Sequence, residues 1–118
     1  PFTAAIATVA KLRELDGAKL MLAQGRKLTA GLREIGLAHG FDLRISGEPS
    51  MWFMRIANDD NMLLHQEWVA ECVRRGAFFT NHHNLFINCA ISDKDIEHTF
   101  AIAEDAFKTV KERHPEIF

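Results

Sequence analysis

The chain has 118 residues, of which 47% are hydrophobic and 25% charged, and its formal net charge at pH 7 is −2. These values are ordinary for a globular protein, so they exclude long disorder and predict one hydrophobic core. Lysines and arginines are scattered, and no apolar run approaches the roughly 20 residues that span a bilayer, which excludes nucleic acid and membrane as expected partners. The two cysteines lie in apolar runs and no signal-type segment opens the chain, so we expect no disulfide framework and a cytoplasmic location.

Two helices are predicted in the first third of the chain. Between Thr3 and Leu15, apolar residues recur at intervals of three and four, and Thr3 is the predicted N-cap. Asp16 is the predicted cap of a second, amphipathic helix, which ends near Gly36 or Gly40.

A hairpin is predicted next. In residues 41–46 apolar and polar side chains alternate, which is typical of a strand with one buried face. Residues 47–50 (GEPS) have turn chemistry, and residues 51–56 are apolar on both faces except for Arg55. We therefore expect two antiparallel strands, the second more central than the first.

The second half of the chain returns to helical spacing over residues 64–75, followed by Gly76 as a stop. Residues 77–80 and 85–90 then form short apolar runs, which predict two further strands on either side of a polar loop.

A last helix is predicted to begin at Ser92 within a capping sequence and to end before Pro115. The element order is then ααββαββα, which indicates an α+β fold with a small antiparallel sheet and helices packed on one face. The apolar stripe of the last helix consists of Ile96, Phe100, Ala103, Phe107 and Val110.

The polar segment 81–84 (NHHN) is the most conspicuous candidate site. Adjacent imidazoles can bind a metal or exchange protons near neutral pH. His82 and His83 diverge in an extended segment, however, and no carboxylate or cysteine joins them at metal-ligand spacing, so no metal site is predicted. Two interpretations remain: a solvated loop, or a loop with His82, His83 and Asn84 that meets the active site of another domain.

Several motifs occur in a recognisable order. Residues 75–79 (RGAFF) precede 83–90 (HNLFINCA), and the stretch 92–107 runs from SDKDIE to AEDAF; upstream lie PFTAA at 1–5 and GEPSMW at 47–52. Together these stretches resemble the C-terminal small domain of class III aminotransferases, which depend on pyridoxal phosphate (PLP), and in particular their glutamate-1-semialdehyde aminomutase branch.

The resemblance implies a domain of a larger enzyme, an aminomutase or aminotransferase. Residues 1–15 are then the helix that leaves the large domain, and residues 16–118 are the small domain. The large domain of the same chain is expected to carry PLP and its lysine, the parent to be a homodimer, and the substrate to be a small amino or oxo acid. The small domain helps to close the substrate site, with His82, His83 and Asn84 facing the substrate, and is not catalytic alone.

No catalytic or cofactor-binding residue is expected within the chain itself. There is no glycine-rich phosphate loop, and the lysines fall on predicted helices, mostly on polar faces, where none is expected to form a Schiff base. Strand 85–89 also lacks the arginine that many class III aminotransferases use there for a substrate carboxylate, which favours the aminomutase branch. The loop 81–84 is shorter than the aminomutase pattern and lacks its acidic residue.

Two other functions remain as alternatives. A free-standing α+β binding or interaction module without enzymatic activity would also present an apolar patch along Ala5, Ile6 and Val9. An autonomous hydrolase would use Cys72 or the histidines, but Cys72 lies on an apolar helical stripe, where burial is the expected state.

Overall fold

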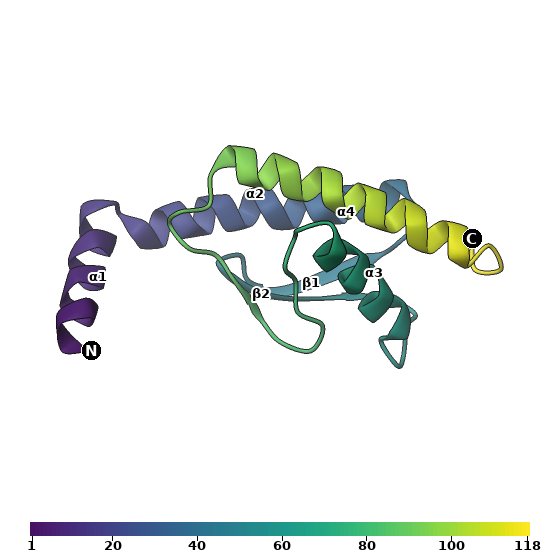
Figure 1. Cartoon of the computed structure of the whole chain (residues 1–118), viewed down its shortest axis with the longest axis horizontal. Helices are drawn as coiled ribbons and strands as arrows, with labels where there is room; N and C mark the ends of the chain where they lie inside the picture. The colour runs from purple at the N-terminus through teal and green to yellow at the C-terminus, as the bar shows by residue number, and fades with distance from the viewer.

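The computed structural model describes residues 1–118 and has the expected α+β architecture, with four helices and a three-stranded antiparallel sheet (Figure 1). The two longest helices pack side by side over the sheet, and the first helix extends from one end of the molecule. No helix is both long and apolar enough to cross a membrane. The elements are α1 (Phe2–Glu14), α2 (Gly17–Ala38), β1 (Leu43–Glu48), β2 (Met51–Ile56), α3 (Leu63–Arg74), β3 (Leu85–Phe86) and α4 (Asp93–Arg113).

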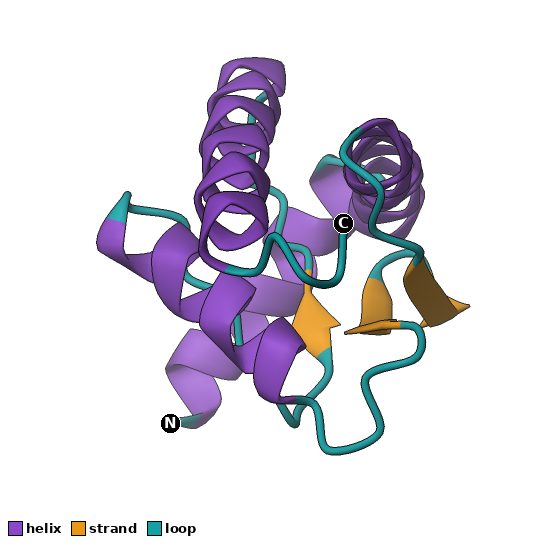
Figure 2. Ribbon diagram, turned by 90° about the vertical axis from the view of Figure 1, so that its right-hand side faces the viewer, coloured by secondary structure: helices purple, strands orange, loops and turns teal.

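The sheet has the order β1-β2-β3, and one face is covered by helices (Figure 2). Trp52, Met54 and Ile56 alternate with more exposed residues along β2 and are buried under α2, α3 and α4. In the antiparallel register Leu43 of β1 lies opposite Ile56, and Leu85 of β3 lies opposite Trp52. The hairpin prediction is therefore confirmed, with β2 as the central strand.

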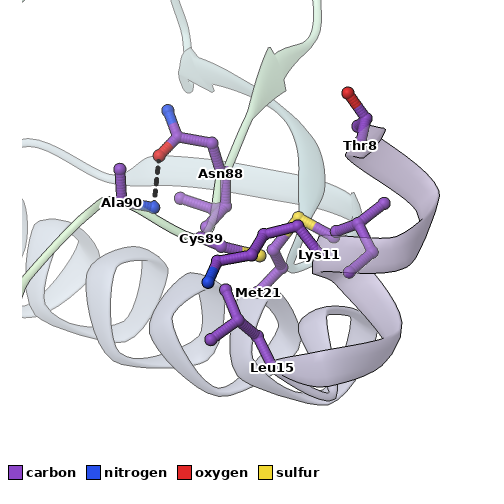
Figure 3. Close-up of a pocket in the computed structure, with 9 residues that line it drawn as sticks. Thr8, Lys11, Leu15, Met21, Asn88, Cys89 and Ala90 are labelled. Carbon is purple, nitrogen blue, oxygen red and sulfur yellow. Dashed lines mark hydrogen bonds between the residues drawn. The ribbon is translucent and has the colours of Figure 1, made fainter. Parts of the chain in front are cut away.

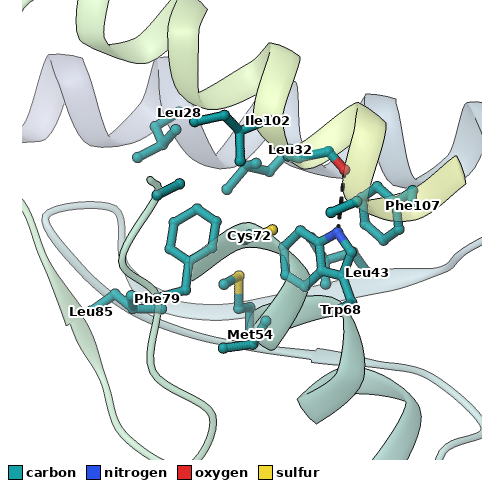
Figure 4. Close-up of a cluster of buried hydrophobic side chains, with 14 of the residues drawn as sticks. Leu28, Leu32, Leu43, Met54, Trp68, Cys72, Phe79, Leu85, Ile102 and Phe107 are labelled. Carbon is teal, nitrogen blue, oxygen red and sulfur yellow. Dashed lines mark hydrogen bonds between the residues drawn. The ribbon is translucent and has the colours of Figure 1, made fainter. Parts of the chain in front are cut away.

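An aromatic stack joins α3, α4 and the segment that follows α3 (Figure 4). The indole ring of Trp68 on α3 stacks on Phe107 of α4 at 4.6 Å between ring centroids and on Phe79 at 5.7 Å. Its Nε1–H donates to the carbonyl oxygen of Ala103 at 3.3 Å. The buried indole therefore has both its apolar surface and its polar group satisfied.

One predicted strand is wrong and another is too long. Residues 77–80 form no strand, although Phe79 is buried and Phe78 exposed. The Ala77 N–H donates to Cys72 O and continues the end of α3, so no ladder partner is needed there. β3 includes only two of the six predicted residues, and the observed order is ααββαβα.

The predicted helix caps hold only in part. Ser92 begins α4 with a complete capping box, in which its hydroxyl accepts from the Asp95 N–H and the Asp95 carboxylate accepts from the Ser92 N–H. Asp16 precedes α2 in the left-handed region (φ 49°) without a side-chain cap, and Thr3 lies inside α1 rather than before it. Along the α4 stripe only Phe100 is half-buried instead of buried.

α2 approaches the β1–β2 turn most closely at Gly25. A Cβ atom at this buried position would lie 1.9 Å from the carbonyl oxygen of Pro49 and 3.0 Å from the Ser50 nitrogen. Both obstacles are backbone atoms, so the contact between helix and turn requires glycine.

Gly25→Ala should destabilise the protein by about 1–3 kcal/mol through overpacking, although alanine is the better helix former. The matched control is Gly31→Ala on the same helix, whose Cβ would meet only the far end of the Phe100 ring, a side chain that can rotate away. Urea unfolding midpoints measure both effects. A Gly25→Ala chain as stable as the parent would contradict the close packing.

α3 buries a histidine at its first turn. His65 is 0% exposed, lies 5.7 Å from the Trp68 ring between centroids, and donates its backbone N–H to Asp59 Oδ2 at 2.7 Å. Burial lowers the pKa of the His65 imidazole from 6.5 to about 4. The Asp59 carboxylate opposes this shift, whereas His82 and Arg55 reinforce it. His65 is therefore neutral at pH 7.

The protein should lose stability on mild acidification, before most carboxylates titrate. Unfolded His65 binds a proton below about pH 6.5, whereas folded His65 binds one only below about pH 4. Between these two pH values the unfolded state binds more protons than the folded state. The free energy of unfolding therefore decreases as the pH is lowered. From about pH 8 to pH 5 the expected loss is about 2 kcal/mol, measured by urea midpoints.

His65→Leu is the control, because it should remove this part of the pH profile. The comparison also removes the contribution of His114 to the pH profile, because both chains contain this residue. The hydrogen bond to Glu67 raises the pKa of His114. Its contribution to stability is therefore present at low pH and lost as pH rises, opposite to that of His65. If parent and His65→Leu chains have parallel profiles, His65 does not titrate as proposed.

Candidate functional site

The loop 81–84 connects the segment after α3 to β3 and is attached to α3 at its first residue. Asn81 Nδ2 donates to Gln66 Oε1 of α3 at 3.4 Å and lies 3.0 Å from His82 Nε2. Because the amide nitrogen only donates, His82 Nε2 accepts in this contact and its proton is on Nδ1 when the ring is neutral. The loop thus begins on α3 and then turns toward solvent.

The three candidate residues of the loop, His82, His83 and Asn84, are all exposed. His83 Nδ1 lies 2.9 Å from the carbonyl oxygen of Asn84, which can only accept, so Nδ1 carries the proton and Nε2 of the neutral ring is an acceptor. Together with the Asn84 amide, His83 therefore offers hydrogen-bonding groups to a ligand at this surface.

Sequence reasoning missed two apolar residues beside the loop. Phe86, 60% exposed, lies 6.1 Å from the His83 ring between centroids, and its cross-strand partner is Met51, 45% exposed. Both side chains belong to the uncovered face of the sheet. The signal was present in the alternation of β3, since Leu85 faces the core and Phe86 must then face away.

The histidine pair of the loop has no third ligand. Nowhere in the molecule do three His, Cys, Asp or Glu side chains group so as to hold a metal ion.

The two cysteines lie in different environments. Cys72 is buried in the core, and burial raises the pKa of its thiol to about 12, so the nucleophile of the hydrolase alternative would be protonated at neutral pH. Cys89 is half-buried and lies, with Lys11, at a cleft of about 390 Å³ between α1 and the segment after β3 (Figure 3). The cleft is mainly apolar, with Leu12, Leu15, Met21 and Ile87 among its lining residues.

The lysines of the chain do not fit a role in holding PLP. All of them are exposed, and three have ion pairs at the surface: Lys11 with Glu14, Lys27 with Asp93, and Lys108 with Glu104. A lysine that forms a Schiff base is usually desolvated or placed near another cation, which lowers the pKa of its amine. Even Lys11, at the cleft, keeps 62% of its side chain exposed.

Comparison with known proteins gives two similarities. The aminopentol aminotransferase of Sphingopyxis macrogoltabida is 30% identical over 110 residues, which are 93% of this chain and 26% of that protein. A solved structure of the FumI protein from Sphingopyxis sp. MTA144, in its PLP internal aldimine form, superposes with a TM-score of 0.88 at 29% identity over 94% of this chain and 27% of that one. No protein-family model matches the chain.

The chain spans about a quarter of the length of both relatives, while they match almost all of it. The similarity therefore extends to nearly the whole of the fold described above. Nearly all of the chain is therefore similar to part of an aminotransferase and to part of a protein solved with PLP.

Proposed function

We propose that this chain is the C-terminal domain of a PLP-dependent enzyme that exchanges amino and oxo groups, and that it helps to close the substrate site. The observation that carries the proposal is the similarity of nearly the whole chain to a quarter of an aminotransferase, with a TM-score of 0.88 to FumI. In the parent, a large domain of the same chain binds PLP, and two such chains form a homodimer.

The exposure of α1 supports the proposed domain boundary, with residues 1–15 as the helix that leaves the large domain. No residue of α1 is buried, and Phe2, Ile6 and Val9 are 85%, 71% and 47% exposed. Apolar side chains gathered on a protruding helix are typical of a contact surface. In the parent these residues would pack on the large domain.

PLP supplies the electron sink of the reaction, and the large domain holds it. The part of this chain is to bind and orient the substrate. His83 Nε2 can accept a hydrogen bond, the Asn84 amide can donate or accept, and His82 lies beside them. Phe86 and Met51 form an apolar surface adjacent to these groups and would exclude water from that side of a closed site.

An aminomutase exchanges the amino and oxo groups within one substrate, whereas an aminotransferase moves the amino group to a second substrate. The missing arginine on strand 85–89 supports the aminomutase branch for a parent that acts on a small amino or oxo acid. The name of the Sphingopyxis macrogoltabida relative instead supports transfer of the amino group of an amine to a second, oxo substrate. Requirement for an added oxo acceptor in the parent's assay distinguishes the two.

A PLP titration with borohydride reduction tests whether the large domain, and not this chain, carries the PLP lysine. The 118-residue chain should give no stoichiometric lysine adduct, because all of its lysines are exposed, whereas the complete parent should give one adduct that mass spectrometry maps outside residues 1–118. A stoichiometric adduct at one lysine of this chain would overturn the proposal.

The loop residues are tested by alanine substitution in the complete parent. His83→Ala and Asn84→Ala should each lower kcat/KM by about tenfold or more, the order expected for loss of a substrate hydrogen bond. His98→Ala, an exposed histidine on α4 away from the loop, is the matched control and should leave kcat/KM unchanged. Equal activity of all three variants would show that the loop does not face the substrate.

A further inference from the structure

Two buried side chains near the loop have polar atoms without a hydrogen-bond partner among protein groups. His65 is fully buried with both Nδ1 and Nε2 unpaired, and Asn81 has a buried, unpaired Oδ1. Such groups are rare in folded proteins, because leaving one unsatisfied is costly. Each therefore calls for a partner.

The two residues belong to the same region. Asn81 donates to Gln66, the residue after His65 on α3, and His82, the residue after Asn81, is among the groups that lower the pKa of His65. The charged groups that act on His65 are Asp59 and Arg55. Asp59 uses both carboxylate oxygens on backbone N–H groups of α3, at residues 64 and 65.

The unpaired atoms are chemically complementary. A neutral imidazole has one N–H donor and one acceptor nitrogen, and the Asn81 Oδ1 is an acceptor. A water molecule can accept from the imidazole N–H and donate to Oδ1, and it has a second proton for another acceptor. Internal waters typically make about three such bonds.

We propose that one internal water molecule bridges the imidazole of His65 and the amide oxygen of Asn81, and that His65 is thereby the positioning residue that holds the loop 81–84 on α3. The water gives the N–H of the buried ring a hydrogen-bond acceptor that no protein group supplies. It also adds a second attachment of Asn81 to α3, beside the direct bond to Gln66. This inference does not depend on the function of the loop.

The bridge is first tested by NMR on the 118-residue chain. Nuclear Overhauser effects from a long-lived water to the ring protons of His65 are expected in the parent chain and should disappear in Asn81→Ala. Absence of such a water in the parent chain, or its persistence in Asn81→Ala, would overturn the proposal.

The positioning role is tested by limited proteolysis at the bond between Asn84 and Leu85. His65→Leu and Asn81→Ala should each speed cleavage by about three- to tenfold, as expected when one hydrogen bond is lost from an opening equilibrium. The double variant should be no faster than the faster single one, because both remove the same bridge. His65→Gln, which keeps a donor and an acceptor, should restore slow cleavage, and His98→Leu is the neutral control.

Global unfolding distinguishes positioning from general destabilisation. At about pH 8 the urea midpoint of His65→Leu should stay close to that of the parent chain, since the bridge acts on the loop and an apolar side chain takes the place of the ring in the core. Faster loop cleavage with an unchanged midpoint supports the role. The role would be overturned if the effects of the two single variants on the cleavage rate add up in the double variant, or if the cleavage rate does not change. It would also be overturned if faster cleavage occurs only together with a lower urea midpoint.

Discussion

The stack of Trp68 between Phe107 and Phe79 is the contact on which the arrangement of the domain depends. One indole ring joins α3 to α4 and also fixes the segment that follows α3, so three parts of the chain share one apolar centre. The hydrogen bond from its Nε1–H to Ala103 sets the depth of α3 against α4. The loop 81–84 begins two residues beyond Phe79, and its starting point is therefore determined by the core.

Features decided by local chemistry could be predicted from the sequence. The amphipathic pattern of α2 and α4, the alternation of the hairpin and the capping box at Ser92 each depend on residues close in the chain. Asp16 shows the limit of this reasoning, because it precedes α2 in a left-handed conformation and caps nothing with its side chain.

Features decided by partners distant in sequence could not be predicted. Residues 77–80 form a short apolar run like that of a strand, yet Phe79 packs on Trp68 and not on a neighbouring strand. The complete burial of His65, at the first turn of α3, depends on the packing of that helix against the core. For the candidate site, the polar loop was recognisable by composition, whereas the position of Met51 beside Phe86 emerged only from the pairing of β3 with β2.

Because β3 is short, the loop 81–84 is attached to the sheet by few contacts. Only two residues join this segment to the sheet ladder, while the hairpin and the α2–α4 pair retain their own contacts. Residues 82–84 of the loop are exposed, so they can change their length or conformation without disturbing the core contacts of the flanking Phe79 and Leu85. A domain built in this way can acquire a new ligand preference through insertions at one connection, with its core left intact.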